Sequence, residues 1–293
     1  MRLWPGLVAW LCLAGCSVQI AYNNLDRLAR WSVSDYVDMS DAQRAYFDAR
    51  FGELWAWHRR DHLPQYADFL DDFSARLGDP TSEAEMQALV DRVIGWADEI
   101  EARSMPMAAE LLASLNDDQV ARLAAGLEQS NRELAEPELG APPDQVKKQW
   151  REEFAERFTR FSGRLTAVQK AYLARRSADY RPELVLWADY RRRWQRDFLA
   201  LLDHRHDVER LERGLRRLTA RRERHYGSEL AEVYDHNVRL TREASVWLMN
   251  SLTDRQQQRF ADRLDELAED FRELAAQDPP RQSGEPAPCL VGC

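Results

Sequence analysis

The sequence has no long hydrophobic run, few glycines and only four cysteines. Its apolar segment at residues 3–13 is shorter than the roughly 20 residues that a transmembrane helix needs. No stretch alternates polar and apolar residues for long enough to predict a β-strand. Because only 12 of the 293 residues are Gly while 31% are charged, the composition favours long amphipathic helices over strands and tight turns.

The motifs of common active sites and of nucleic-acid binding are also missing. We find no Gly-rich phosphate loop, no Ser-centred elbow and no paired-carboxylate pattern that rises above the general density of Asp and Glu. The formal net charge is −9, whereas nucleic-acid binding depends on a basic surface. We therefore expect a non-enzymatic protein with no cofactor and no nucleic-acid partner.

The N-terminus predicts a secretory signal peptide. The apolar segment 3–13 follows Arg2 and ends at small residues before Cys16, which is the layout of such a peptide. Leu13-Ala14-Gly15-Cys16 resembles the lipobox of bacterial lipoproteins at all four positions. The resemblance implies cleavage before Cys16, diacylglycerol on its thiol and an acyl chain such as palmitate on its amine. Cleavage by the general peptidase, with Cys16 incidental, is the alternative.

The residue after the cysteine is Ser17 rather than Asp. In Gram-negative lipoproteins this resemblance implies export to the outer membrane, with the protein on the periplasmic face. Two or more acyl chains hold a protein stably on a bilayer, so the membrane itself is the first expected partner. Loss of residues 1–15 removes Arg2, the one charged residue among them, and shifts the net charge from −9 to −10.

The chain directly after the cysteine already has helical spacing. Ile20, Leu25, Leu28 and Trp31 fall near one side of a helix. Almost no flexible tether separates this first helix from the lipid. We therefore expect the body of the protein to lie close to the membrane.

Two other cysteines remain in the mature chain, Cys289 and Cys293. An oxidising periplasm favours their pairing, and flexible chain can bring their Cα atoms within the about 7 Å that a disulfide requires. A small disulfide, a metal-binding pair and a pair of free thiols all stay open.

From Met39 to Gln277 the apolar residues recur at helical spacing, which predicts an all-α, multi-helix bundle. Breaks are expected at 78–80, 137–144, 181–182, 203–207 and 227–228. Pro64 and Pro106 lie inside the helical pattern and predict kinks or short interruptions. The tail, 278–293, lacks periodicity and is expected to be disordered.

One short motif recurs four times: an apolar residue, a Ser, Thr or Asn, two variable residues and a Gln. The small polar residue can cap a helix while the Gln reaches back to the amide of the cap, which forms a capping box worth about 1 kcal/mol. The four pairs are Ser40 and Gln43, Asn116 and Gln119, Thr166 and Gln169, and Thr253 and Gln256. We expect a helix to begin at each pair.

Further similarities suggest an internal duplication. Trp55-Ala56 followed by two arginines is matched by Trp187-Ala188 followed by two arginines, and each block lies between two capping motifs. We hypothesise two homologous helical halves, and chance matching is the alternative. The expected segments are a signal peptide (1–15), the lipidated N-terminus and first helix (16–38), half 1 (39–136), a linker (137–144), half 2 (145–277) and the tail (278–293).

His58 and His62 are a weak candidate for a metal site. They lie four residues apart, a spacing that places two imidazoles on one helix face. Arg59 stands where zinc proteases carry a Glu, and the sequence indicates no third ligand. The sequence therefore favours a solvated or membrane-facing histidine pair and no metal.

Several short runs of residues together resemble a known family: Ala21–Asp26, Trp31, Asp35–Asp38, Gln43-Arg44 and Trp57–Arg60. They are similar to a family of proteobacterial lipoproteins known only as a domain of unknown function. The resemblance covers nearly the whole mature chain and implies no catalytic residues.

A second resemblance is to the Spy/CpxP periplasmic chaperones, whose signature is Leu-Thr-x-x-Gln. Leu165-Thr166 with Gln169 and Leu252-Thr253 with Gln256 match it, while Met39-Ser40 and Leu115-Asn116 depart from it. The leading hypothesis is an outer-membrane lipoprotein that binds another envelope protein or a lipid. A chaperone-like or envelope-stress protein is the second hypothesis, and an unrecognised hydrolase that uses carboxylates brought together by folding is the third.

Overall fold

The computed structural model describes residues 16–135, 140–220, 225–277 and 290. In these residues the regular structure is helical, and the only pairing of β type is an isolated bridge between Leu77 and Asp79. The predicted all-α, multi-helix bundle is confirmed. The signal peptide, Cys289, Cys293 and nearly all of the predicted tail lie outside the described residues.

Helices follow one another along the whole described chain. Before residue 136 they are α2 (Cys16–Asn23), α3 (Leu25–Ser34), α4 (Asp41–Trp57), a π-helical turn (His58–His62), α5 (Leu63–Ser74), α6 (Glu83–Ala113) and α7 (Asp117–Ala135). After residue 139 they are α8 (Pro143–Ser162), α9 (Ala167–Arg176), a 3-10 turn (Ser177–Asp179), α10 (Leu184–Leu202), α11 (Val208–Thr219), α12 (Ser228–Asn250) and α13 (Asp254–Ala276).

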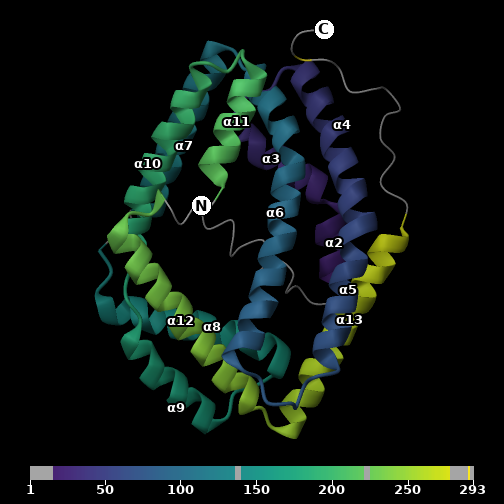
Figure 1. Cartoon of the computed structure of the whole chain (residues 1–293), viewed down its shortest axis with the longest axis vertical. Coiled ribbons are helices and arrows are strands. Elements are labelled where there is room, and N and C mark those ends of the chain that lie inside the picture. Colours follow the sequence, from purple (N-terminus) through teal and green to yellow (C-terminus); the bar gives the residue numbers. More distant parts are fainter. Residues whose placement is uncertain (1–15, 136–139, 221–224, 278–289, 291–293) are drawn as a thin grey trace.

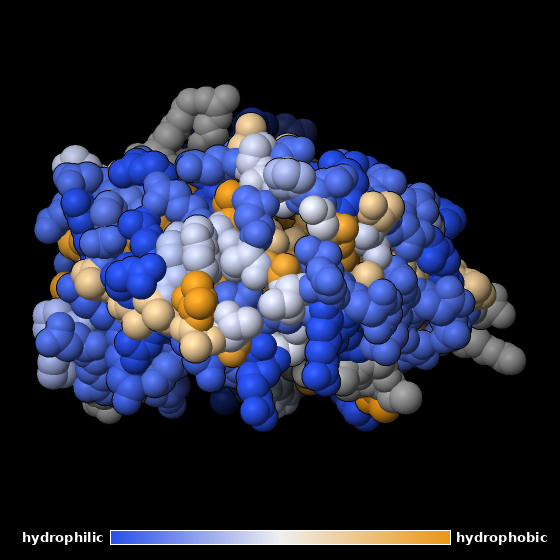
Figure 2. Space-filling model, turned by 90° about the horizontal axis from the view of Figure 1, so that it is seen from below, coloured by the Kyte–Doolittle hydropathy of each residue, from blue (hydrophilic) through white to orange (hydrophobic). Residues whose placement is uncertain are grey.

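The molecule is elongated, and α6 runs along its long axis (Figure 1). On one side lie α4, α5 and α13, while α7, α10 and α11 lie at one end and α8, α9 and α12 at the other. Seen from that second end, the surface is mostly hydrophilic, with small groups of hydrophobic residues near the middle of the face (Figure 2). No helix in the described ranges is both long and apolar enough to cross a bilayer.

The helix ends follow the turn residues of the sequence, with two exceptions. Gly78 and Gly227 have φ angles of 101° and 78°, a region that glycine adopts without steric cost, and each lies at a predicted break. The helix α8 already begins at Pro143, inside the segment that the sequence predicts as linker. Pro106 lies within α6, and the helix continues through it, so of the kink or interruption expected there the interruption is absent.

The hydrophobic cores join the two predicted halves of the chain. One cluster packs Met39 and Phe47 from the first half with Leu202 and Leu211 from the second. Another packs residues of α5 with residues of α13, and these two helices lie along each other. The helix α10 of the second half likewise packs on α7 of the first. The second half also has two smaller clusters of its own, one around Leu173 and Leu248 and one around Tyr190 and Tyr226.

Candidate functional site

The most unusual local structure is the π-helical turn that joins α4 to α5. Here the N–H of Leu63 donates to the carbonyl of His58, five residues back. Pro64 follows directly. Because it has no N–H, it cannot donate to the carbonyl of Arg60 four residues back, and its ring would clash with that carbonyl in a regular α-helix. The wide turn presents His58 and His62 to the interior, and such turns are frequent at functional sites.

A chain of polar side chains crosses the interior at this turn. His58 Nδ1 is hydrogen-bonded to the hydroxyl of Tyr22 at 2.8 Å, and its Nε2 to the hydroxyl of Tyr66 at 3.2 Å. The same Tyr66 hydroxyl lies 3.1 Å from His62 Nδ1. At the outer end, Oε2 of Glu99 on α6 approaches His62 Nε2 at 3.2 Å. We call these five residues the His–Tyr cluster.

The His–Tyr cluster joins the interior to the surface. The histidines are almost fully enclosed, with exposures of 7% for His58 and 1% for His62. The Glu99 side chain, in contrast, is 61% exposed. The expectation of a solvated or membrane-facing histidine pair is therefore wrong. The charged segment that contains the two histidines is covered by α2.

Burial favours the neutral forms of the two histidines and the two tyrosines of the cluster. It lowers the pKa of His58 to about 3, and the neighbouring His62 and Arg59 act in the same direction. It also lowers the pKa of His62, and it raises the pKa values of Tyr22 and Tyr66 above their usual range. Because the Tyr66 hydroxyl can donate to only one of its two imidazoles, the cluster also couples the tautomers of the histidines.

Arg59 lies beside this cluster and links three elements. It is buried, it donates to Oδ1 of Asn23 at 2.7 Å and to the carbonyl of Leu274 at 3.2 Å, and its guanidinium lies 5.1 Å from the centre of the Tyr22 ring. Leu274 belongs to the last turn of α13, where a cation is favoured by the helix dipole. Arg59 thus fastens α2 to the π turn and to α13.

Aromatic rings enclose the cluster on both sides. Trp55 stacks on His58 with ring centres 5.0 Å apart and packs against Tyr22 at 4.2 Å. On the other side Trp96 of α6 packs against Tyr66 at 4.5 Å. These rings exclude water from the imidazoles, which is the physical cause of their lowered pKa values.

The cluster attaches α2, the helix that begins at the predicted lipidation site, to the body. Besides the Tyr22 contact, Gln19 donates to Asp270 at 2.8 Å and to Glu273 at 2.6 Å, both on α13. Val18 is buried on the same side. The helix begins at Cys16 itself, so only its own turns separate that residue from the packed core. Ser17 follows within the first turn.

The histidines are not part of a metal-ligand group. Within the described residues no set of three or more His, Cys, Asp or Glu side chains could hold a metal ion. Both nitrogens of His58 and Nδ1 of His62 are bonded to tyrosine hydroxyls. The geometry supports a structural hydrogen-bond chain rather than a cation site.

Sequence reasoning found the two histidines but missed Tyr22, Arg59 and Tyr66. Tyr66 lies four residues after His62, so its place on the same helix face is a usable signal. Tyr22 is separated from His58 by 36 residues, and nothing local indicates the contact.

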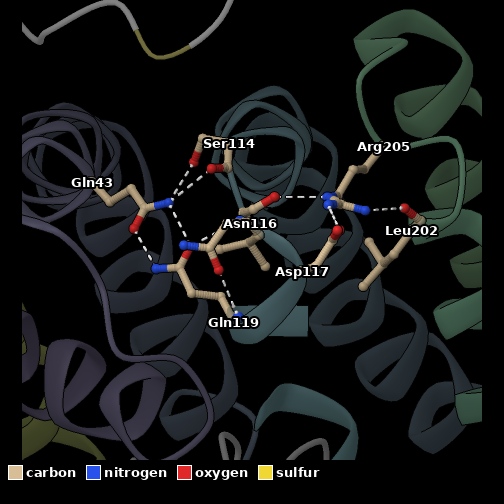
Figure 3. A network of polar contacts seen from close by, with 8 residues as sticks. Gln43, Ser114, Asn116, Asp117, Gln119, Leu202 and Arg205 are labelled. Atoms are coloured by element: carbon tan, nitrogen blue, oxygen red, sulfur yellow. Dashed lines mark hydrogen bonds and ion pairs between the residues drawn. The ribbon is translucent and has the colours of Figure 1, made fainter. Parts of the chain in front are cut away.

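The four capping motifs form a second polar feature. The reciprocal hydrogen bonds of a capping box are present at Ser40, Thr166 and Thr253, and Asn116 and Gln119 exchange the same two bonds. In addition, the motifs meet in pairs. The Gln43 amide donates to Gln119 at 3.2 Å and to the Ser114 carbonyl at 3.0 Å (Figure 3). Gln119 in return donates to Gln43 at 2.7 Å.

The second pair repeats this arrangement. Gln169 donates to Gln256 at 3.1 Å and to the Ser251 carbonyl at 3.0 Å, and Gln256 donates back to Gln169 at 2.9 Å. We call each of these buried arrangements a Gln clasp. Their matching partners are what two homologous halves would produce, and the duplication stays a hypothesis. The surroundings differ, because the first clasp has Arg205 beside it, which donates to the Leu115 carbonyl at 2.7 Å (Figure 3).

The family of the chain follows from a comparison with known proteins. The model of a family of unknown function, DUF6279, matches residues 35–231. The chain belongs to DUF6279. No curated protein and no solved structure matches the chain.

The DUF6279 match includes part of each polar feature. It contains the π turn, Tyr66 and Glu99, but begins after Tyr22 and ends before Gln256. It is narrower than the resemblance inferred from the sequence, which reached back to Ala21. The Gln clasps account for the Leu-Thr-x-x-Gln motifs by hydrogen bonding alone, so these motifs add no support for chaperone activity.

Proposed function

We propose that this DUF6279 protein is a non-enzymatic lipoprotein, held on the periplasmic face of the outer membrane by acyl chains on Cys16, where it binds another envelope protein or a lipid. The observation that carries the proposal is the run Leu13-Ala14-Gly15-Cys16 with Ser17 directly after it. The cysteine also stands at the first residue of α2.

The attachment of α2 supports a role near the membrane. The contacts of Gln19 and Tyr22 begin within two turns of Cys16, so a lipid there has no flexible linker to the body. A lipoprotein that reaches distant partners needs a long tether, because reach grows with linker length. The partner is therefore sought in the membrane itself or in proteins that lie directly on it.

Replacement of the cysteine tests the anchor. We expect the full-length protein, expressed in a Gram-negative host, to incorporate labelled palmitate, to carry the mass of the acyl groups and to pellet with membranes. Cys16→Ser should abolish the label and leave the protein uncleaved or soluble, whereas Cys12→Ser, in the expected signal peptide, should not change the label. Equal labelling of wild type and Cys16→Ser would contradict the proposal.

Substitutions of Ser17 test which of the two membranes holds the protein. Wild type should sediment with the outer membrane in a density gradient, and Ser17→Asp should move the same lipidated protein to the inner membrane. Ser17→Ala is the matched control and should stay with the outer membrane. Inner-membrane localisation of the wild type would contradict this part of the proposal.

A further inference from the structure

One face of α2 and α3 is not covered by the body. Ile20 and Trp31 are 64% and 62% exposed, although both are large hydrophobic residues. The opposite face of the same helices is packed: Val18 and Tyr22 are buried, and Val33 contacts the core. Of the apolar residues that the sequence places on one side of this first helix, the first and the last, Ile20 and Trp31, are therefore exposed to solvent.

The exposed residues fall on one line along the two helices. Ile20, Arg27 and Trp31 are spaced by seven and four residues, which places them on one helix face over about three turns. Only Asn24 separates α2 from α3, and its carbonyl still accepts the N–H of Leu28 at 3.0 Å. Arg27 is exposed as well. We call these three residues the N-terminal stripe.

We propose that the N-terminal stripe docks on the bilayer surface and fixes the orientation of the body on the membrane. This inference rests on the proposed lipid anchor at Cys16. Ile20 lies one turn beyond Cys16, about 6 Å along the helix, so acyl chains on that cysteine bring the bilayer within reach of the stripe.

The residue types of the stripe suit a lipid interface. Tryptophan is enriched at the membrane–water boundary because its ring is apolar while its N–H needs a polar partner. Arg27 can bind lipid phosphate, and Ile20 adds apolar area that gains free energy on leaving water. Other exposed hydrophobic residues, such as Val168 on α9 and Val185 on α10, belong to helices that lie on the other side of α6 from α2 (Figure 1).

The anchor makes even a weak surface contact effective. Acyl chains on Cys16 keep the stripe at a high local concentration next to the bilayer, so docking becomes an intramolecular step. The α3 helix is itself held to the body by an ion pair at 2.9 Å between Arg30 and Asp48 on α4. Contact of the stripe with lipid therefore orients the whole molecule rather than a loose segment.

A depth measurement on the lipidated full-length protein tests this inference. An environment-sensitive fluorophore is attached at Arg27→Cys in a Cys289→Ser, Cys293→Ser background, which leaves Ile20 and Trp31 intact. The protein is reconstituted into phosphatidylethanolamine–phosphatidylglycerol vesicles whose acyl chains carry bromine. We expect quenching by at least about twofold relative to unbrominated vesicles, and no quenching of the same fluorophore at Val185→Cys.

A second variant separates docking from anchoring. Ile20→Ser with Trp31→Ser should reduce the quenching at position 27 to the level at position 185, while the protein still pellets with vesicles through its acyl chains. Val168→Ser is the matched control and should leave the quenching unchanged. Equal quenching at 27 and 185, or quenching that survives the double change, would overturn the docking alone. Absence of acyl groups from the protein mass would overturn the proposed function and the docking with it.

Discussion

The His–Tyr cluster and the Gln clasps are both buried polar networks, but they differ in chemistry. The clasps consist of neutral amides that satisfy each other, and their hydrogen bonding does not change with pH. The cluster contains two histidines whose neutral forms are favoured by burial. The clasps therefore act as permanent joints between helix ends, whereas the attachment of α2 depends on the protonation state of two histidines.

The largest expected effect follows from breaking a clasp. Gln256→Leu removes the capping-box bond that the Thr253 amide donates to the Gln256 side chain, and it leaves the amide of Gln169 without its buried partner, so it should lower the free energy of unfolding by about 3 kcal/mol. Gln258→Leu is the matched control on the same helix, since Gln258 is exposed, and its effect should stay within about 0.5 kcal/mol.

Urea unfolding at pH 7.5 measures both variants. The double change of Gln169 and Gln256 to Leu should cost less than the sum of the two single changes, because neither partner is then left unsatisfied. Additive losses would show that the two amides are not coupled. Each Gln would then stabilise only the capping box of its own helix.

The pH dependence of stability should come from the cluster and not from the clasps. The unfolded chain binds a proton at His58 below about pH 6.5, while the folded protein does not until about pH 3. Stability is thus unaffected by this group above pH 6.5 and falls as the pH drops below it, by about 2 kcal/mol at pH 5. The lowered pKa of His62 adds a loss of the same sign.

His58→Phe tests this origin. It loses the bonds to both tyrosines at every pH, but the difference in unfolding free energy between pH 7.5 and pH 5 should be about 2 kcal/mol smaller than in wild type. Gln256→Leu should leave that difference as it is in wild type. An unchanged pH difference in His58→Phe would mean that His58 has the same pKa in the folded and the unfolded chain, and would contradict this origin.

Sequence reasoning succeeded where the interaction is local. The helix starts at Ser40, Thr166 and Thr253 depend on residues three positions apart, so the motif alone predicts them. The pairing of Gln43 with Gln119 spans 76 residues. It uses the part of each amide that the capping box leaves free, and no local pattern shows where that group donates.

The His–Tyr cluster was hidden for a different reason. The segment His58 to His62 contains two arginines and an aspartate, and its charge predicts an exposed helix face. The π turn and the cover provided by α2 reverse that expectation, because they place Arg59 and both histidines in the interior while Arg60 stays at the surface. The cover depends on tertiary contacts of Tyr22, which lies outside the family match.

The smallest of the three effects concerns the contact that joins α2 to the cluster. Tyr22→Phe keeps the ring that packs against Trp55 and removes only the hydroxyl hydrogen-bonded to His58, so it should lower the free energy of unfolding by about 1 kcal/mol. Ile20→Ser is the control on the same helix, because Ile20 is exposed. In the non-lipidated protein that starts at Ser17, its effect should be within about 0.5 kcal/mol.

Native-state hydrogen exchange of the α2 amides tests the central claim, that the helix beginning at Cys16 is fastened to the body by the His–Tyr cluster. In the lipidated protein at pH 7.5, the amides of residues 20–23 should exchange slowly, and Tyr22→Phe should speed their exchange about fivefold, the factor that about 1 kcal/mol gives, with no change in α6. Exchange of these amides at the rate of an unfolded peptide in the wild type would contradict the claim, because Cys16 would then be joined to the body by a flexible tether.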